Sequence, residues 1–202
     1  MAETFTSPKQ KLSYALGLSI ASNIIGAGIK EIESEQVVAA LNDALNGSDL
    51  KMSAEEANAT IQQYLQELQS KAGQVNKEAG EAFLKENATK EGVSVMDCGI
   101  QYIVLQEGEG AKPTLESQVK CHYHGTLIDG SVFDSSVERN DPATFPLNGV
   151  IQGWQIALQE MQVGEKRRLF IPSDLAYGER GAGGAIQPNA TLIFEVELLE
   201  IV

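Results

Sequence analysis

The stretch that decides the fold runs from residue 118 to residue 136 and reads QVKCHYHGTLIDGSVFDSS. Its first part alternates, so that Val119, Cys121 and Tyr123 would point to one face of a strand and the residues between them to the other. The pair Asp129-Gly130 then supplies the residues of a tight hairpin turn. The stretch therefore predicts a half-buried strand over residues 118–128 that is followed by a reversal of the chain.

The rest of the second half of the chain carries the same kind of signal. Short runs rich in β-branched and aromatic residues predict further strands over residues 93–105, 166–172 and 191–202. One short helix is expected over residues 153–161, where the apolar residues, Trp154 among them, follow helical spacing. A short helix against a mostly antiparallel sheet predicts an α+β domain.

The first half of the chain predicts helices. Ser7 is a suitable N-cap, Pro8 suits the first helical position, and Gln10 completes a capping box for a first helix that ends near Gly26. A second helix is expected over residues 34–45.

A third helix begins at a second capping box, Ser53 to Glu56, and is expected to continue to about residue 91. Gly73 and Gly80 weaken such a helix relative to alanine and permit bending. We therefore divide the chain into a helical module over residues 1–52, a connecting helix over residues 53–91 and a β-rich domain over residues 92–202.

The helical module poses a packing problem. Two short helices and a long helix with a single apolar stripe enclose little core, while Leu18, Ile24, Ile25 and Ile29 add apolar surface. The favoured solution is a homodimer formed through residues 1–52. The alternative is a three-helix bundle that packs on the β-rich domain of the same chain.

The charge and the cysteine content limit the classes of partner and site that we expect. A net charge of −13 disfavours nucleic-acid and anionic membrane partners. The N-terminus lacks the continuous apolar run of a secretory signal, so the cytoplasm is the expected location, with the periplasm as the alternative if a signal has been removed. Cys98 and Cys121 are expected to be reduced thiols. His122 and His124 are expected on a solvated strand face, so we expect no metal and no cofactor. Residues 165–168 are expected at a strand edge.

Seven short segments, taken together and in order, resemble the FKBP-type peptidyl-prolyl cis/trans isomerases. They are VKCHYHG (119–125), GSVFDSS (130–136), VIQGW (150–154), MQVGEK (161–166), IP (171–172), AYG (176–178) and NATLIFEVEL (189–198). With helices ahead of this domain, the whole chain is similar to the bacterial macrophage infectivity potentiator-like subgroup. The resemblance implies an FKBP-like domain, dimerisation through the N-terminal helices, and binding of macrolides such as rapamycin.

The resemblance also assigns site residues. It implies a pocket with Trp154 as its floor, in which Tyr177 and the backbone N–H of Ile151 bind substrate carbonyls. Asp134 would lie at the rim, held by Arg139. The catalytic set implied is Tyr123, Phe133, Asp134, Tyr177 and Phe194. The substrate-binding set implied is Arg139, Phe145, Val150, Ile151, Trp154 and Ile186. The chain departs from the family pattern at Ala143, Ala182, Ala185 and Gln187, which puts peptide preference and inhibitor affinity in doubt.

These residue types suit rotation about an X-Pro bond. The barrier to that rotation, about 18–20 kcal/mol for a peptide bond, arises from amide resonance. A dry aromatic pocket disfavours the charge-separated planar amide more than the twisted one, and no nucleophile is needed. We therefore expect an isomerase that acts on unfolded or flexible proline-containing chains. The alternative is a chaperone or peptide-binding module with incidental isomerase activity.

Overall fold

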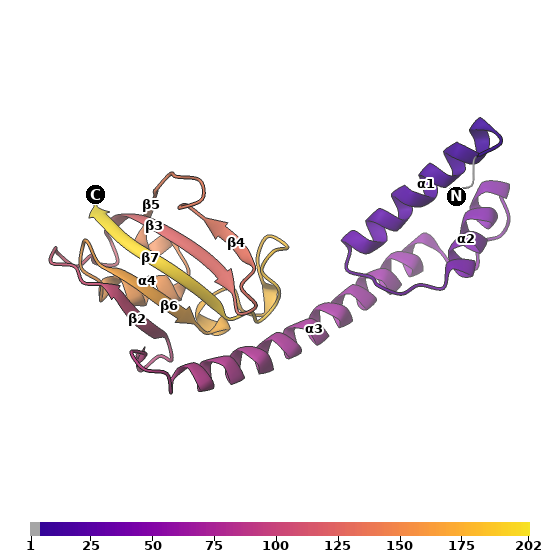
Figure 1. Ribbon diagram of the computed structural model, residues 1–202. Coiled ribbons are helices and arrows are strands. Elements are labelled where there is room, and N and C mark those ends of the chain that lie inside the picture. The colour runs from indigo at the N-terminus through magenta and orange to yellow at the C-terminus, as the bar shows by residue number, and fades with distance from the viewer. Residues whose placement is uncertain (1–4) are drawn as a thin grey trace. The chain divides into compact units, whose positions relative to one another are not determined.

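The computed structural model describes residues 5–202, and the chain divides into two compact units, up to Leu68 and from Gln69 onward. The first unit contains α1 (Pro8–Gly26), α2 (Ser34–Asn46) and the start of α3 (Ala54–Asn87) (Figure 1). Within residues 5–202 there is no helix with the length and hydropathy required to span a bilayer.

The helices of the first unit begin where the capping residues predict. The Ser7 hydroxyl accepts the N–H of Gln10 at 3.2 Å. At the start of α3, the Ser53 hydroxyl accepts the N–H of Glu56, and the Glu56 carboxylate accepts the N–H of Ser53 at 2.7 Å. None of the residues of α1 or α2 is buried within this one chain.

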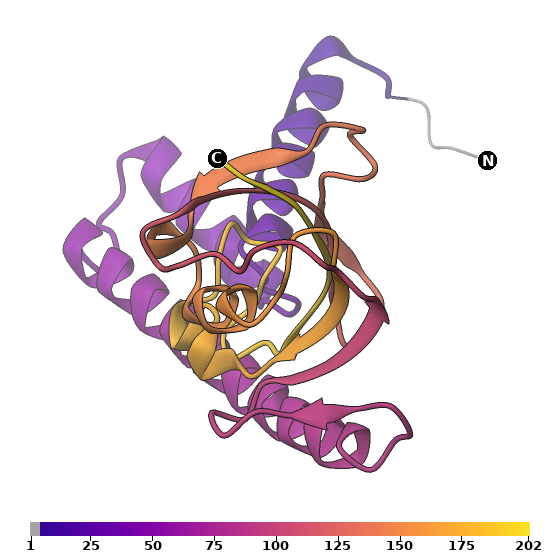
Figure 2. The same cartoon turned by 90° about the vertical axis from the view of Figure 1, so that its left-hand side faces the viewer.

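The second unit is built on one antiparallel sheet. In spatial order its strands are β1 (Ser94–Val95), β2 (Gln101–Gln106), β6 (Lys166–Ile171), β7 (Leu192–Ile201), β3 (Gln118–Leu127) and β4 (Val132–Ser135), and β5 (Ala143–Pro146) also pairs with β3. The strands curve around α4 (Gln152–Gln159) (Figure 2). Short 3₁₀ turns occupy Leu147–Gly149, Ser173–Leu175 and Gly178–Arg180. The predicted α+β fold is confirmed.

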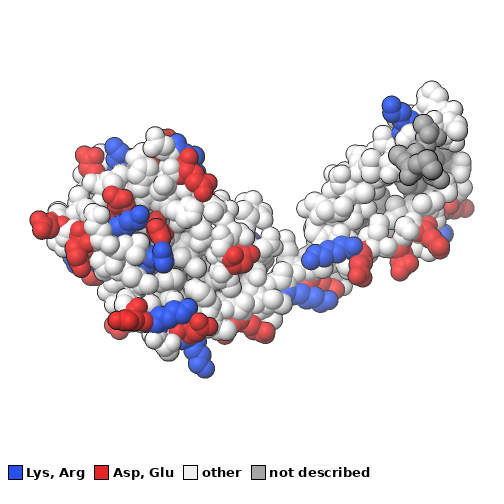
Figure 3. All heavy atoms as spheres, viewed as in Figure 1, with Lys and Arg blue, Asp and Glu red and all other residues white. Residues whose placement is uncertain are grey.

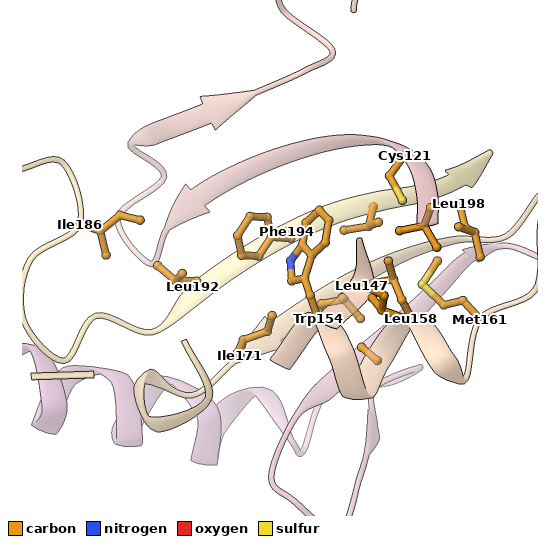
Figure 4. Close-up of a cluster of buried hydrophobic side chains, with 14 residues drawn as sticks. Cys121, Leu147, Trp154, Leu158, Met161, Ile171, Ile186, Leu192, Phe194 and Leu198 are labelled. Carbon is orange, nitrogen blue, oxygen red and sulfur yellow. The ribbon is translucent and has the colours of Figure 1, made fainter. Parts of the chain in front are cut away.

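The core lies between the sheet and α4. From Leu192 to Leu198, every second residue of β7 is buried, as a strand with one covered face requires. Figure 4 shows several of these side chains meeting those of α4. The core cluster includes Val119, Cys121, Leu147, Trp154, Ala157, Leu158, Met161, Leu169, Ile171, Leu192, Phe194, Val196 and Leu198.

Charged side chains of both signs are scattered over the face in Figure 3 and do not gather into a basic patch there.

The run over residues 165–168 was expected at a strand edge, and this was wrong. Residues 166–168 of this run lie in β6, which pairs with β2 on one side and β7 on the other. The buried Arg167 is accommodated because it forms an ion pair with Glu165 and stacks over the Tyr102 ring at 4.5 Å.

The predicted strand over residues 93–105 is also interrupted. A tight turn separates β1 from β2, in which the N–H of Gly99 donates to the carbonyl of Met96 at 2.8 Å. Gly99 has a φ of 89°, a conformation that glycine adopts without steric cost. The strands β4 and β5 were not predicted, because runs of only four residues carry little periodic signal.

The second half of α3 belongs to the second unit and packs on its sheet. Phe83 contacts Phe170 with ring centroids 5.9 Å apart. At the end of the helix, the buried Asn87 amide donates to the side chain of Gln101, which in turn donates to the carbonyl of Leu84. Gly73 and Gly80, expected as bending positions, are buried within a continuous helix.

Candidate active site

A cavity of about 520 Å³ opens on the second unit between the sheet, α4 and the segment that precedes β7. Most of its lining is aromatic or aliphatic. The lining residues are Tyr123, Phe133, Asp134, Phe145, Gly149, Val150, Ile151, Trp154, Tyr177, Ala182, Gly183, Ala185, Ile186 and Phe194. Every predicted site residue except Arg139 therefore faces one hollow.

Trp154 forms the floor of this cavity. It lies on α4 with only 4% of its surface exposed. Its ring contacts those of Tyr123, Phe145 and Phe194 at centroid distances of 5.5, 5.4 and 5.1 Å, respectively. Within the described residues, the indole N–H has no hydrogen-bond partner. The floor is thus held by ring packing.

One wall depends on a glycine of β3. Phe133 and Phe194 meet edge to face with centroids 5.4 Å apart. A Cβ atom at Gly125 would lie 2.6 and 2.7 Å from two ring atoms of Phe133, far inside van der Waals contact. The two phenyl rings can therefore line the cavity because position 125 carries no side chain.

The rim of the cavity holds a hydrogen-bonded set of three residues. The Tyr123 hydroxyl donates to Asp134 Oδ2 at 2.5 Å, and Arg139 forms an ion pair with the same carboxylate. Arg139 also donates to the Tyr123 hydroxyl at 3.1 Å. It therefore contacts two residues that line the cavity without lining the cavity itself. Partial burial acts to raise the pKa of Asp134, but hydrogen bonds from Tyr123 and Arg139 leave it below its usual value. Burial, with the bond to Asp134, raises the pKa of Tyr123.

A second layer of polar contacts fixes the backbone of the rim. The fully buried Ser136 accepts the N–H of Tyr123 at 2.7 Å, and its hydroxyl lies 3.0 Å from His122 Nδ1. His124 Nδ1 lies 2.9 Å from the Ser135 hydroxyl. The expected solvated face at His122 and His124 is found only in part, because both rings are half-buried against serines. The Ser-Ser pair after Asp134 belongs to a segment that carries the family resemblance, but no contact with the histidines was predicted for it.

The two residues predicted to bind substrate carbonyls, Tyr177 and Ile151, both line the cavity. Tyr177 is 41% exposed. Ile151 is the N-cap of α4, so its N–H lies ahead of the hydrogen-bonding ladder of the helix. Above them, Ala182 and Ile186 exchange backbone hydrogen bonds of 2.8 and 3.0 Å and form a small closed loop over the cavity.

Two family models cover most of the chain. Residues 109–199 match the model described as FKBP-type peptidyl-prolyl cis-trans isomerase, and residues 9–104 match the domain amino-terminal to it. The chain belongs to the FKBP-type peptidyl-prolyl isomerase family. This confirms the resemblance on which the site was first assigned.

Similar proteins span the whole chain. The FKBP-type 22 kDa peptidyl-prolyl cis-trans isomerase of Escherichia coli is 44% identical over 98% of both chains. The peptidyl-prolyl cis-trans isomerase Mip of Coxiella burnetii is 42% identical over 99% of this chain and 90% of its own. The crystal structure of FkpA from Escherichia coli superimposes with a TM-score of 0.76 at 35% identity, over 98% of both chains.

The protein is therefore a peptidyl-prolyl cis/trans isomerase, and it binds proline-containing peptides. The alternative of a chaperone with incidental isomerase activity is not favoured, because these relatives are named for the isomerase reaction. The roles of the individual cavity residues remain predictions.

Proposed function

We propose that the isomerase binds an X-Pro segment in the Trp154 cavity and stabilises the twisted prolyl amide there. The observation that carries this proposal is the indole floor enclosed by Tyr123, Phe133, Phe145 and Phe194. A compact apolar proline ring gains contact area on such a floor. Exclusion of water then penalises the planar amide, which has the greater charge separation, more than the twisted one.

The polar groups at the opening would orient the chain on either side of proline. The Tyr177 hydroxyl and the Ile151 N–H can each donate to a carbonyl that flanks the rotating bond. The bond network of Asp134 with Tyr123 and Arg139 would keep the rim rigid while the amide turns. No covalent intermediate is required, since rotation interrupts the resonance of the amide without making or breaking a σ bond.

The test is a pair of neighbouring substitutions. Phe133→Ala removes a cavity wall, whereas Val137→Ala changes an exposed residue outside the lining. We expect Phe133→Ala to lower kcat/KM for cis-to-trans exchange of a short X-Pro peptide and Val137→Ala to leave it unchanged. Full activity of a folded Phe133→Ala protein would contradict the proposal.

We also propose that the N-terminal helices form a homodimer, with residues 1–52 as its module, residues 53–91 as the connecting helix and residues 92–202 as the isomerase domain. The support is the exposure of the apolar side chains of α1, among which Leu12, Leu16 and Ile25 are 60, 58 and 71% exposed. Burying such a side chain stabilises by about 1.5–3 kcal/mol, so a second copy would gain much by covering them.

The dimer has a measurable consequence. Two linked pockets would raise capture of a large client through effective concentration. Light scattering should give twice the mass of one chain, and Leu16→Lys should yield a monomer that keeps its activity on a peptide and loses part of it on an unfolded protein. Lys9→Ala, on the same helix, is the control. A monomeric unsubstituted chain at all concentrations would refute the dimer.

Two further expectations concern ligands and location. Macrolide binding in the same cavity is proposed, and it predicts that rapamycin quenches the fluorescence of Trp154, the one tryptophan of the chain. A cytoplasmic location, without nucleic-acid or membrane partners, is also kept as a proposal. A relative in Legionella longbeachae, 38% identical, is named outer membrane protein MIP, so cell fractionation is the appropriate test.

A further inference from the structure

The segment that overhangs the cavity, residues 182–189, makes contacts on two sides. Ala182, Ala185 and Ile186 line the hollow. A few residues later, Pro188 and Asn189 contact the second half of α3. Figure 4 shows the Ile186 side chain on this segment, on the side of the cluster where Phe194 and Trp154 lie. The same short stretch of backbone therefore contacts both the cavity and the helix.

The contact with α3 uses a reciprocal pair of amide side chains. Asn76 Nδ2 donates to the carbonyl of Pro188 at 2.9 Å. Asn189 Nδ2 donates in the opposite direction, to the carbonyl of Gly73 at 3.3 Å. Proline has no backbone N–H of its own, so the carbonyl is the one backbone hydrogen-bonding group of Pro188, and Asn76 satisfies it.

Two glycines allow the backbones to approach this closely. A Cβ atom at Gly73 would lie 3.1 Å from both Pro188 Cβ and Asn189 Nδ2. A Cβ atom at Gly80 would lie 2.3 Å from the Thr191 hydroxyl. Gly73, Asn76 and Gly80 are spaced by three and four residues, which places them on one face of the helix. Glycine destabilises a helix relative to alanine, and the contact accounts for its presence here.

The loop between the two contacts is closed and short. Ala182 and Ile186 exchange backbone hydrogen bonds, and the N–H of Asn189 donates to the carbonyl of Gly178 at 2.8 Å. Asn189 itself has a φ of 55°, a conformation that few non-glycine residues adopt. With both ends of the loop tied in this way, a displacement of Pro188 moves Ile186, which lies only two residues before it.

We propose that Gly73, Asn76 and Gly80 of α3 are positioning residues for the isomerase. They fix the position of the overhanging segment relative to the cavity in which the substrate binds. The inference rests on the proposed role of the Trp154 cavity as the substrate site. None of these residues lines the cavity. Gly73 and Asn76 act through Pro188 and Asn189, and Gly80 acts through Thr191. The helix that leads into the catalytic domain is thereby part of the architecture of its pocket.

The experiment compares Asn76→Ala with Lys77→Ala in the full chain. Both changes replace a residue on α3 with the best helix former, so neither weakens the helix. Only Asn76 bonds to the segment, since Lys77 is exposed. Asn76→Asp keeps the shape and removes the donor, and therefore tests the hydrogen bond itself. The first readout is hydrogen exchange at the amides of Ala182, Ile186 and Asn189.

We expect faster exchange at these amides in Asn76→Ala and Asn76→Asp, with unchanged exchange in Lys77→Ala. For an X-Pro peptide, kcat/KM should fall roughly two- to tenfold, as expected for one lost hydrogen bond, and mainly through KM. Emission from Trp154 should shift in the same two variants. Gly73→Ala, which pushes on Pro188, should reproduce these effects.

Unchanged amide exchange in Asn76→Ala would overturn the proposal, whatever happens to the activity. Faster exchange with unchanged kcat/KM would also overturn it, because loosening the segment would then have no effect on catalysis. A failure of the proposed cavity function has a different signature. It would show as full activity when Phe133 is replaced by alanine, whereas exchange at Ala182 and Ile186 would still respond to Asn76.

Discussion

Replacing Trp154 with leucine should lower kcat/KM severalfold while the domain remains folded. The indole meets Tyr123, Phe145 and Phe194 at centroid distances of 5.5, 5.4 and 5.1 Å. Each such contact contributes about 0.5–1.5 kcal/mol, so their loss should destabilise the domain by roughly 1.5–4.5 kcal/mol. Trp154→Leu breaks no hydrogen bond, since the indole N–H has no partner within residues 5–202.

The effect on catalysis follows from the contact that a bound proline would lose. Burying an apolar group of this size stabilises by about 1.5–3 kcal/mol. If the floor provides half of that contact in the twisted state, the loss is roughly 0.75–1.5 kcal/mol, or about four- to thirteenfold in kcat/KM. The assay is cis-to-trans exchange of a short X-Pro peptide, at a temperature where circular dichroism shows the variant folded.

Leu158→Ala is the matched control. Leu158 is fully buried on the same helix and does not line the cavity. Its truncation should cost about 2–5 kcal/mol of stability, comparable to the loss in Trp154→Leu. We expect kcat/KM of the folded control to stay near that of the unsubstituted protein. If both variants lose activity equally, or if folded Trp154→Leu keeps full activity, the indole floor has no special role.

Three further predictions follow from the same domain. Gly125→Ala should destabilise it by about 1–3 kcal/mol in chemical denaturation, because the new Cβ overlaps Phe133 at 2.6 Å; an unchanged midpoint would contradict the overlap. The pKa of Asp134 is lowered in the folded state, so its carboxylate stabilises the fold above about pH 4 and this contribution is lost as the pH falls through the folded pKa. The Tm difference between the unsubstituted protein and Asp134→Asn should thus shrink below about pH 4, and a difference that grows there would be inconsistent with this sign. Burial raises the pKa of the Cys121 thiol to about 12, so a thiol reagent at pH 8 should label only the exposed Cys98 until the protein is unfolded, as mass spectrometry of the peptides would reveal.

The fold was largely predictable because its long elements carry periodic signals. The alternation around Tyr123 and the capping box at Ser53 gave the strand and the helix start that the structure has. The four-residue strands β4 and β5 were missed, because their pairing is decided by contacts with β3 across the sheet. Residues 165–168 were misplaced for a related reason, since the charge of Arg167 is neutralised only by its neighbours in the folded domain.

The site was predictable only through the resemblance. Composition and spacing alone could not distinguish Trp154 from an ordinary core residue, because a pocket floor and a core share the same apolar chemistry. Nor could the sequence reveal that Gly73 and Asn76 contact Pro188 and Asn189, more than a hundred positions later, which requires the folded domain. The contacts of His122 and His124 with serine hydroxyls were not predicted, because such contacts leave no periodic pattern in the sequence.

The missing side chain at Gly125 has a consequence for how this cavity can change over evolution. The phenyl ring of Phe133 occupies the volume that a methyl group at position 125 would take. The two positions are therefore expected to vary together among related isomerases, with a larger residue at 125 accompanied by a smaller one at 133. A lineage that acquired such a pair would exchange part of its aromatic wall for an aliphatic one, and with it the shape of substrate that it accepts.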